Sequence, residues 1–369
     1  MKKIICIVPY TYLPAKTGGQ KCIASLYKTL SQSYSLGVIG TKANDIRNVK
    51  YKSYNIFSGS LLRYIDPLNY LRIKKIITEE RADYLQIEHP YMGWMGYLLQ
   101  KSTGVKLIVR SHNIEGLRFK NLNKWWWRIL LHYEQWVCRQ AQINYFITDD
   151  DKQQAIATFK LDASRCFTIT YGIDQTAPLP VRERLMARNF LEQKHHLSPG
   201  DTIILFNGAF GYAPNINALN NVINHIFPLL KTSDKGFKLI VCGKDIPAEI
   251  VSGSKDRDII FTGFVPDINV YLAGAHVFVN PVIEGGGIKT KLVEALALNL
   301  TCVSYKSGAI GIPAAICGDK LLVVEDGMTA HFADAIIKAS GIDSDIPTAF
   351  YDQFSNNNIL NKVKNILGT

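Results

Sequence analysis

The stretch Asn280-Pro-Val-Ile-Glu284-Gly-Gly-Gly-Ile-Lys289-Thr-Lys291-Leu-Val-Glu294-Ala-Leu-Ala decides the fold. An apolar run that ends at Asn280 predicts a strand, and the amphipathic pattern that begins near Thr290 predicts a helix. Between them, Gly285, Gly286 and Gly287 let the backbone approach a ligand closely and point successive N–H groups at it. A strand, a glycine loop and a helix in this order favour a phosphate-binding site in a parallel α/β fold.

The charged residues of this stretch suit a departing diphosphate. The N-terminus of the helix carries a partial positive charge that favours phosphate, and Lys289 and Lys291 add two cations. Glu294 lies three residues after Lys291 and therefore on the same helix face. We expect Lys291 to hold a phosphate while Glu294 accepts from ribose hydroxyls. A glycine-rich turn with solvated lysines is the alternative interpretation.

Outward from this stretch, short apolar runs alternate with amphipathic segments along the whole chain, which predicts parallel sheets with helical crossovers. The expected strands are 4–8, 35–39, 84–87, 106–110 and 145–148 in the first half, and 202–207, 238–242, 258–261, 276–279 and 301–305 in the second. Helices are expected over 22–31, 70–81 and 125–140. The pattern predicts two doubly wound, Rossmann-like α/β domains facing a central cleft.

The domain boundaries follow from changes in composition. The length of 369 residues suits two cores, and prolines and glycines frame a charged, helix-prone stretch near 176–200. We expect a first, acceptor-side domain over 1–175, a linker and entry helix over 176–200, and a donor-binding domain over 201–345. Residues 346–369 are expected to form a C-terminal helix that could cross back to the first domain.

The 280–297 stretch resembles the donor-binding signature of glycosyltransferase family 4, whose members are retaining, nucleotide-sugar-dependent enzymes of the GT-B fold. The resemblance implies that Glu284 approaches hydroxyls of the donor sugar and Glu294 the ribose. The family's usual spacing leaves seven residues between the two glutamates, whereas nine intervene here. A subgroup with a Gly-x-Gly-Ile-Lys-x-Lys insertion is similar, so Ile288 belongs to the insertion and Glu284 is the displaced first glutamate.

Other stretches resemble the family in the same order along the chain. They are Gly18-Gly19, Arg110-Ser-His112-Asn113-Ile-Glu115, Thr170-Tyr-Gly172-Ile-Asp174, Asn207-Gly208 through Ala218, and Phe261-Thr-Gly263 through Asp267. The resemblance implies that Gly18 and Gly19 admit donor phosphates and acceptor, and that His112 and Asn113 face the donor sugar. His112 is expected to form a hydrogen bond with that sugar and not to abstract a proton. Gly208 opens the donor domain.

The chain departs from the family at 207–217. Many members place an arginine and a lysine there to hold the diphosphate, but this stretch is uncharged. We therefore expect Lys289 and Lys291 to take over that duty. If they did not, a non-catalytic nucleotide-sugar-binding subunit would be the better interpretation.

The positive charge of the chain lies entirely in its first half. The net charge is +11, and residues 1–175 hold 25 Lys and Arg against 13 Asp and Glu, a net of +12, while 176–369 hold 17 against 18. The same half contains the run Lys124-Trp125-Trp126-Trp127-Arg128, and tryptophan flanked by cations suits a bilayer headgroup region. We expect contact with an anionic membrane surface, with a core helix or a protein contact as the alternative.

Metal, cofactor and nucleic-acid functions find little support. The histidines show no metal-ligand spacing, and the acidic run Asp149-Asp150-Asp151 reads better as a helix start than as a manganese site. No nucleic-acid-reading module is recognisable. Seven scattered cysteines without a Cys-x-x-Cys pair predict reduced thiols in the cytosol, and Pro9 ends the first apolar run too early for a signal peptide.

The expected function is a metal-independent, retaining transfer of a hexose-type sugar from a UDP- or GDP-linked donor, with no cofactor. The expected acceptor is a glycan or lipid-linked glycan in the synthesis of cell-surface polysaccharide, lipopolysaccharide or glycolipid. The enzyme would work in the cytoplasm, peripherally on the inner face of the plasma membrane. A nucleotide-sugar epimerase of the same fold is the alternative enzyme.

Overall fold

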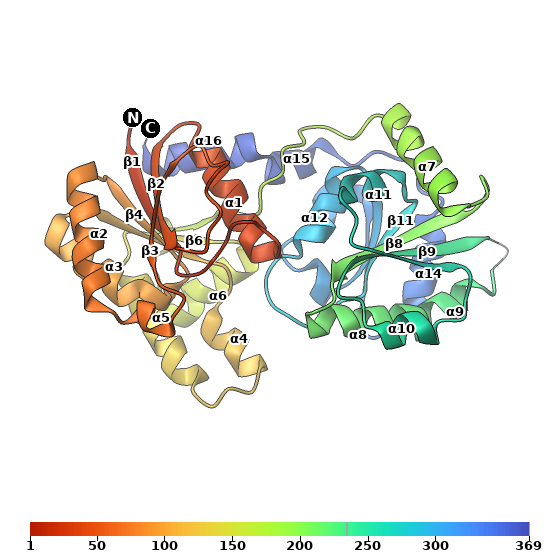
Figure 1. Ribbon diagram of the computed structural model, residues 1–369, viewed down its shortest axis with the longest axis horizontal. Helices are drawn as coiled ribbons and strands as arrows, with labels where there is room; N and C mark the ends of the chain where they lie inside the picture. The colour runs from red at the N-terminus through yellow and green to blue at the C-terminus, as the bar shows by residue number, and fades with distance from the viewer. Residues whose placement is uncertain (234, 369) are drawn as a thin grey trace. The chain divides into compact units, whose positions relative to one another are not determined.

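The computed structural model describes residues 1–233 and 235–368. The chain forms two compact units, Met1–Gly172 with Asn356–Thr369, and Ile173–Ser355. Each unit is a twisted parallel sheet with helices on both faces (Figure 1). The predicted fold class, two Rossmann-like doubly wound α/β domains, is confirmed.

The first unit has a seven-stranded sheet of order β3-β2-β1-β4-β5-β6-β7, in which every paired strand is parallel. The strands are β1 Lys3–Ile7, β2 Ser35–Thr41, β3 Lys52–Phe57, β4 Tyr84–Glu88, β5 Lys106–Ser111, β6 Ile143–Phe146 and β7 Cys166–Thr168. The helices are α1 Gly18–Leu30, α2 Pro67–Glu80, α3 Gly93–Thr103, α4 Glu115–Asn121, α5 Trp127–Gln140, α6 Asp149–Phe159 and α16 Asn356–Leu367.

Strand β1 shows why helices cover both faces of this sheet. Alternate residues of a strand point to opposite faces, and here both sets are apolar. Ile4 and Cys6 pack in a core beneath α1 and α16, whereas Ile5 and Ile7 pack in a second core beneath α2, α3 and α5. Most of the polar chemistry in this unit therefore lies at the ends of the strands.

The second unit repeats the plan with six parallel strands in the order β10-β9-β8-β11-β12-β13. The strands are β8 Thr202–Ala209, β9 Phe237–Lys244, β10 Ile259–Gly263, β11 Val277–Asn280, β12 Thr301–Tyr305 and β13 Leu321–Val324. The helices are α7 Val181–His195, α8 Ala213–Asn221, α9 Phe227–Leu230, α10 Ala248–Gly253, α11 Ile268–Gly274, α12 Thr290–Ala297, α13 Ala314–Cys317, α14 Thr329–Ala339 and α15 Thr348–Phe354. The predicted strand end at Asn280 and helix start at Thr290 are both confirmed.

The division of the chain differs in detail from the boundaries expected from the sequence. The first unit ends at Gly172, and the segment expected as a linker carries α7, which packs within the second unit. Arg188 of α7 donates to the carbonyl oxygens of Gly274 and Ala275 (3.1 and 3.3 Å) and so ties the helix to the end of α11. The C-terminal segment forms two helices, of which α15 belongs to the second unit and α16 to the first.

The contact between α7 and α11 yields a test of this packing. A Cβ atom at Gly274 would lie 2.8 Å from the backbone carbonyl carbon and oxygen of Ala187, and a backbone cannot yield as a side chain can. Gly274→Ala should therefore destabilise the second unit by about 1–3 kcal/mol, the usual cost of overpacking. Gly253→Ala is the matched control, because a Cβ there meets nothing within 4 Å. Urea unfolding measures both, and equal stability of the two variants would contradict the packing.

Candidate functional site

The carboxyl ends of β8, β9, β10 and β11 meet at one edge of the second sheet. A hollow of about 450 Å³ opens at the ends of β9 and β10. Its lining comprises Gly243–Ile246, Val251 and Phe261–Phe264, and so includes part of the segment 261–267 that the family resemblance singled out. Ligands of open parallel sheets bind at this kind of edge.

The glycine loop after β11 requires glycine at two of its positions. Gly285 and Gly287 have φ values of 84° and 71°, in the left-handed region that residues with a Cβ rarely adopt. A Cβ at Gly285 would also lie 2.6 Å from the hydroxyl of Tyr212. The loop is exposed at Gly286, and it leads through half-buried Ile288 into α12, whose first residue, Thr290, is buried.

Lys291 extends from α12 to the end of β8. Its Nζ atom donates to the carbonyl oxygen of Asn207 and to Oδ1 of Asn215, each at 3.2 Å. It also lies 4.8 Å from the ring centroid of Phe206. The ammonium therefore sits within the segment 207–217 that lacks cations of its own.

The surroundings of Lys291 disfavour its charge. Both oxygens that accept hydrogen bonds from its Nζ, those of Asn207 and Asn215, are neutral. Burial, and secondarily the charge of Lys289, lower the pKa of Lys291 to about 7. An anion placed beside Nζ would reverse this shift, so the site is electrostatically suited to a phosphate.

Lys289 forms hydrogen bonds with the glycine loop that precedes it. Its Nζ donates to the carbonyl oxygens of Gly285 (2.7 Å), Gly286 and Gly287 (3.3 Å each). Burial lowers the pKa of Lys289 to about 8. Lys289 thus stabilises the conformation of the loop, while Lys291 reaches across to β8.

The two glutamates occupy different surroundings. Glu284 is exposed, and its Oε1 accepts from Nδ2 of Asn217 at 3.0 Å, which links the glycine loop to α8. Glu294 is half-buried on α12, three residues after Lys291. Gly208 belongs to β8, where a Cβ would lie 3.0 Å from the amide of Asn215. The contacts of Glu284, Glu294 and Gly208 with a ligand remain predictions.

In the first unit, Gly18 and Gly19 form the first turn of α1, directly after the β1 loop. The preceding turn is fixed by Gln20, whose Oε1 accepts from the backbone N–H groups of Lys16 and Thr17 (2.8 and 2.9 Å). A Cβ at Gly19 would meet nothing within 4 Å. Packing in the chain therefore does not explain this glycine, and close approach of a ligand remains the prediction.

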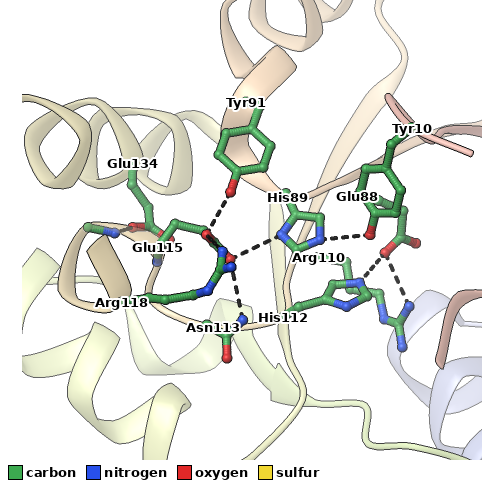
Figure 2. A network of polar contacts seen from close by, with 11 residues as sticks. Tyr10, Glu88, His89, Tyr91, Arg110, His112, Asn113, Glu115, Arg118 and Glu134 are labelled. Carbon is green, nitrogen blue, oxygen red and sulfur yellow. Dashed lines mark hydrogen bonds and ion pairs between the residues drawn. The ribbon is translucent and has the colours of Figure 1, made fainter. Parts of the chain in front are cut away.

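Glu88, at the carboxyl end of β4, is the hub of the polar contacts in the first unit (Figure 2). Oε2 accepts from Nη1 of Arg110 (3.1 Å) and from Nε2 of His112 (2.6 Å), and Oε1 accepts from Tyr27 (2.9 Å) and Gln86 (2.7 Å). Burial alone would raise the pKa of this carboxyl group, but Arg110 and the hydrogen bonds outweigh burial and lower it to about 2. Glu88 is therefore an anion throughout the physiological range.

The ionised Glu88 fixes the proton of His112. A carboxylate only accepts, so the hydrogen of the neutral imidazole must lie on Nε2. Burial and the neighbouring His89 lower the pKa of His112 to about 4, which keeps the ring neutral. Nδ1 then carries a lone pair that can accept from a ligand hydroxyl. His112 follows β5 directly, as the sequence predicted.

A second group of polar residues lies beside His112. The His89 ring stacks on those of His112 (centroids 4.3 Å apart) and Tyr91 (5.4 Å), and its Nε2 lies 2.9 Å from the hydroxyl of Tyr10. Nδ1 of His89 lies 3.4 Å from Oε1 of Glu115, an ion-pair distance without hydrogen-bond geometry. His89 has φ 61°, strain that clusters at functional sites.

Asn113 and Glu115 continue this network. Nδ2 of Asn113 donates to Oε1 of Glu115 (3.3 Å), whereas the buried Oδ1 of Asn113 has no partner among the described residues. Arg118 and Tyr91 donate to Oε2 of Glu115 (2.8 and 2.6 Å). Burial alone would raise the pKa of Glu115, but its polar contacts outweigh burial and hold it well below the usual range.

Several residues of the two candidate sites were not predicted from the sequence. They are Tyr10, Glu88, His89 and Tyr91 in the first unit, and Asn215 and Asn217 in the second. A signal existed for Glu88, because a charged residue at the end of a mostly apolar strand is buried only when it is paired. Asn215 and Asn217 lie in the stretch 207–218 that resembles the family, but nothing local predicted their contacts, because their partners lie about 70 residues away in the chain.

The acidic run Asp149-Asp150-Asp151 occupies the first turn of α6, which Thr148 caps by accepting from the N–H of Asp151 at 3.0 Å. The preferred helix-start interpretation is thus supported. Over residues 1–233 and 235–368, no three His, Cys, Asp or Glu side chains converge as metal ligands.

The chain matches two family models. Residues 18–176 match glycosyltransferase family 4, and residues 201–340 match glycosyl transferases group 1. A Klebsiella pneumoniae protein named as an uncharacterized 44.6 kDa protein in the cps region is 23% identical over 96% of this chain and 95% of its own.

Two solved structures show the same fold. Anabaena Alr3699/HepE in complex with UDP has a TM-score of 0.72, 14% identity and 99% coverage of both chains. WaaG, described as a glycosyltransferase involved in lipopolysaccharide biosynthesis, has a TM-score of 0.63 and 14% identity, covering 99% of this chain and 100% of that one.

The hub at Glu88 predicts acid sensitivity. Glu88→Gln leaves buried Arg110 without its counter-charge, so the first unit should lose about 3–5 kcal/mol of stability at neutral pH. Because the folded pKa (about 2) lies below the ordinary value of 4.5, the contribution of Glu88 is present above pH 4.5 and disappears as the pH falls toward 2.

Urea unfolding of wild type and Glu88→Gln at pH 7 and pH 3 measures this difference, which should be smaller at pH 3. Glu79→Gln, at an exposed position on α2, is the control and should change stability by less than about 0.5 kcal/mol. A wild-type advantage over Glu88→Gln that is the same at both pH values would contradict the assignment.

Proposed function

Because the chain belongs to glycosyltransferase family 4 and has the GT-B fold, we propose that it transfers a sugar from a nucleotide-sugar donor with retention of configuration. The second unit would bind the donor at the carboxyl edge of its sheet. The first unit would contribute contacts to sugar hydroxyls.

The position of Lys291 is the observation that carries this proposal. Family members commonly hold the diphosphate with cations in the segment that corresponds to 207–217, and this chain has none there. The structure brings Nζ of Lys291 to Asn207 and Asn215 in that segment, at 3.2 Å from each acceptor. One ammonium from α12 thus stands where a diphosphate would need a charge. This supports a transferase over a non-catalytic binding subunit.

The proposed donor pose follows the edge of the sheet. The base would occupy the 450 Å³ hollow at β9 and β10, and the diphosphate would lie at Lys291 and the N-terminus of α12. Glu294 would accept from ribose hydroxyls and Glu284 from hydroxyls of a hexose. HepE binds UDP, which makes UDP the first nucleotide to test, with GDP as the alternative.

The proposed reaction is a front-face displacement. The acceptor hydroxyl attacks the anomeric carbon from the face that the diphosphate leaves, and its proton passes to an oxygen of the departing diphosphate. The bond between that carbon and the diphosphate oxygen breaks as the new glycosidic bond forms. Lys291 would stabilise the charge that develops on the leaving group, which is electrostatic catalysis that needs no metal or other cofactor.

His112 would assist as a hydrogen-bond acceptor. Glu88 holds the proton on Nε2, so Nδ1 can accept from a sugar hydroxyl. Asn113 offers a second acceptor, its unpartnered Oδ1. Neither group is proposed to abstract a proton, because a His112 pKa of about 4 makes the ring a weak base.

We propose a glycan or lipid-linked glycan acceptor at the cytoplasmic face of an anionic membrane. Within the described residues, no helix is both long and apolar enough to cross a bilayer. Trp125 is 83% exposed, whereas Trp126 packs against Phe119 and the ring of Trp127 is in contact with Lys120 and Arg128. A second group of exposed apolar residues was not predicted from the sequence and comprises Leu61, Leu62, Ile65, Leu68 and Leu71.

The similarity to WaaG, a glycosyltransferase involved in lipopolysaccharide biosynthesis, supports a role in the synthesis of an envelope polysaccharide.

Turnover tests the donor site. Lys291→Ala and Glu294→Gln should each lower kcat/KM by about 100-fold or more, as loss of a transition-state contact does, while the fold survives. A chelator should leave wild-type turnover unchanged. Lys255→Ala, at an exposed lysine of the same unit, is the control.

The assay measures release of nucleoside diphosphate from a panel of UDP- and GDP-sugars with a membrane-lipid acceptor extract. Wild-type rates in both site variants would refute the donor site. Conversion of the donor sugar without an acceptor would instead indicate an epimerase.

Vesicle flotation tests the membrane proposal. The protein should bind vesicles that contain anionic lipid and bind neutral vesicles much less, because surface cations contribute roughly 1 kcal/mol each near an acidic leaflet. Trp125→Ser and Ile65→Ser should each weaken binding in high salt, where the apolar contribution remains. Leu185→Ser, at a half-exposed apolar position of the second unit, is the control. Equal binding to both lipid compositions would contradict the proposal.

A further inference from the structure

A cavity of about 220 Å³ lies at the opposite edge of the second sheet, where β11, β12 and β13 begin. It is bounded by α7 (Arg184, Arg188), by Ala275 and His276 before β11, by 298–301 before β12, by Lys320 before β13, and by 340–343 after α14. Because the strands are parallel, the donor loop and this cavity lie at opposite ends of β11. The cavity is therefore separate from the donor site. It has room for about seven water molecules, or for one small ligand.

Lys320 is the most deeply buried cation of this cavity. Its side chain is 2% exposed, and its Nζ donates to Oγ1 of Thr301 at 3.1 Å. An ammonium has three donor hydrogens, and a neutral hydroxyl satisfies only one of them. Burial lowers the pKa of Lys320, with a further lowering by Arg184. A buried cation with so few partners is suited to an anionic ligand.

Two arginines reinforce the positive charge. Arg188 is anchored by the carbonyl oxygens of Gly274 and Ala275, which leave its charge without a carboxylate partner in those contacts. Nε of Arg184 is buried and has no hydrogen-bond partner among the described residues. The nearest carboxylate to Arg184 is that of Asp345, at an ion-pair distance of 3.8 Å. Both guanidinium groups can thus still take a bidentate acceptor.

The acidic groups near the cavity do not cancel these charges. Asp343 and Asp345 are exposed, so water screens them, whereas Lys320 is buried and the arginines are half-buried. Nδ1 of His276 already accepts from the N–H of Ile203 (3.0 Å), and burial lowers the pKa of this histidine to about 4. Lys235 adds a cation at the rim, where its Nζ donates to Oγ of Ser340 at 2.7 Å.

We propose that this cavity binds the phosphate group of a small phosphorylated polyol or sugar, at a site distinct from the donor site. The phosphate oxygens would accept from Arg184, Arg188 and Lys320, and the exposed carboxylate of Asp343 would accept from a hydroxyl of the same ligand. This division of roles favours a phosphomonoester that carries hydroxyl groups over inorganic phosphate. A neutral sugar fits less well, because it would bring no negative charge to Lys320 or to the two arginines.

Calorimetric titration with glycerol 3-phosphate and with inorganic phosphate tests the proposal. The titration is made in the full-length Lys291→Met background, which removes the proposed phosphate contact of the donor site. We expect one binding site, tighter for glycerol 3-phosphate. Arg184→Gln and Lys320→Met should each weaken binding at least tenfold. Arg182→Gln, at an exposed arginine of the same helix α7, should bind as the parent does.

Three results would overturn the proposal. They are no binding of glycerol 3-phosphate to the Lys291→Met parent, unchanged affinity in both cavity variants, and equal weakening in Arg182→Gln, which would indicate nonspecific attraction. Circular dichroism establishes that the variants fold. If Lys320→Met does not fold, Arg184→Gln decides alone, because its side chain has only a distant ion pair to lose.

Discussion

Every strand pair in both sheets is parallel, and the interior strands bury mainly apolar side chains on both faces. This constraint leaves mainly the ends of the strands for polar chemistry. Glu88 ends β4, and His112 follows β5, which places them together at the carboxyl edge of the first sheet. The glycine loop after β11 and the contacts of Asn207 at β8 share the corresponding edge of the second sheet. The two groups of polar residues therefore arise from one architectural rule applied twice.

The two lysines of the insertion, Lys289 and Lys291, make different contacts. Lys289 donates to three carbonyl oxygens of its own loop, which fixes a backbone that only glycine adopts easily at 285 and 287. Lys291 contacts neutral oxygens on β8 and α8, and burial lowers its pKa to about 7, so its surroundings disfavour the charged form. A phosphate would supply the missing counter-charge. The same physical reasoning, a buried cation short of acceptors, underlies the cavity around Lys320 at the other end of the sheet.

The sequence predicted the central strands of both sheets well, since each is a short and mostly apolar run, such as 4–8 or 277–280. It missed β3, β7 and β13, which are all edge strands. β3 is half-exposed and lacks an apolar run, and β7 has only three residues. The glycine loop and α12 were predicted because their signal is local. The Glu88 hub and the contacts of Lys291 with Asn215 were not, because they join segments that are far apart in the chain and depend on side-chain directions.

Proton linkage tests most directly whether Lys291 holds the donor diphosphate. The free pKa of about 7 should rise when UDP binds, so binding at pH 8 should take up a proton. Calorimetric titration of UDP in two buffers with different ionisation enthalpies measures this uptake. We expect uptake approaching one proton at pH 8 in the wild type, much less at pH 6, and a smaller uptake with weaker binding in Lys291→Met. Equal affinity and equal proton uptake in the wild type and Lys291→Met would contradict this role of Lys291.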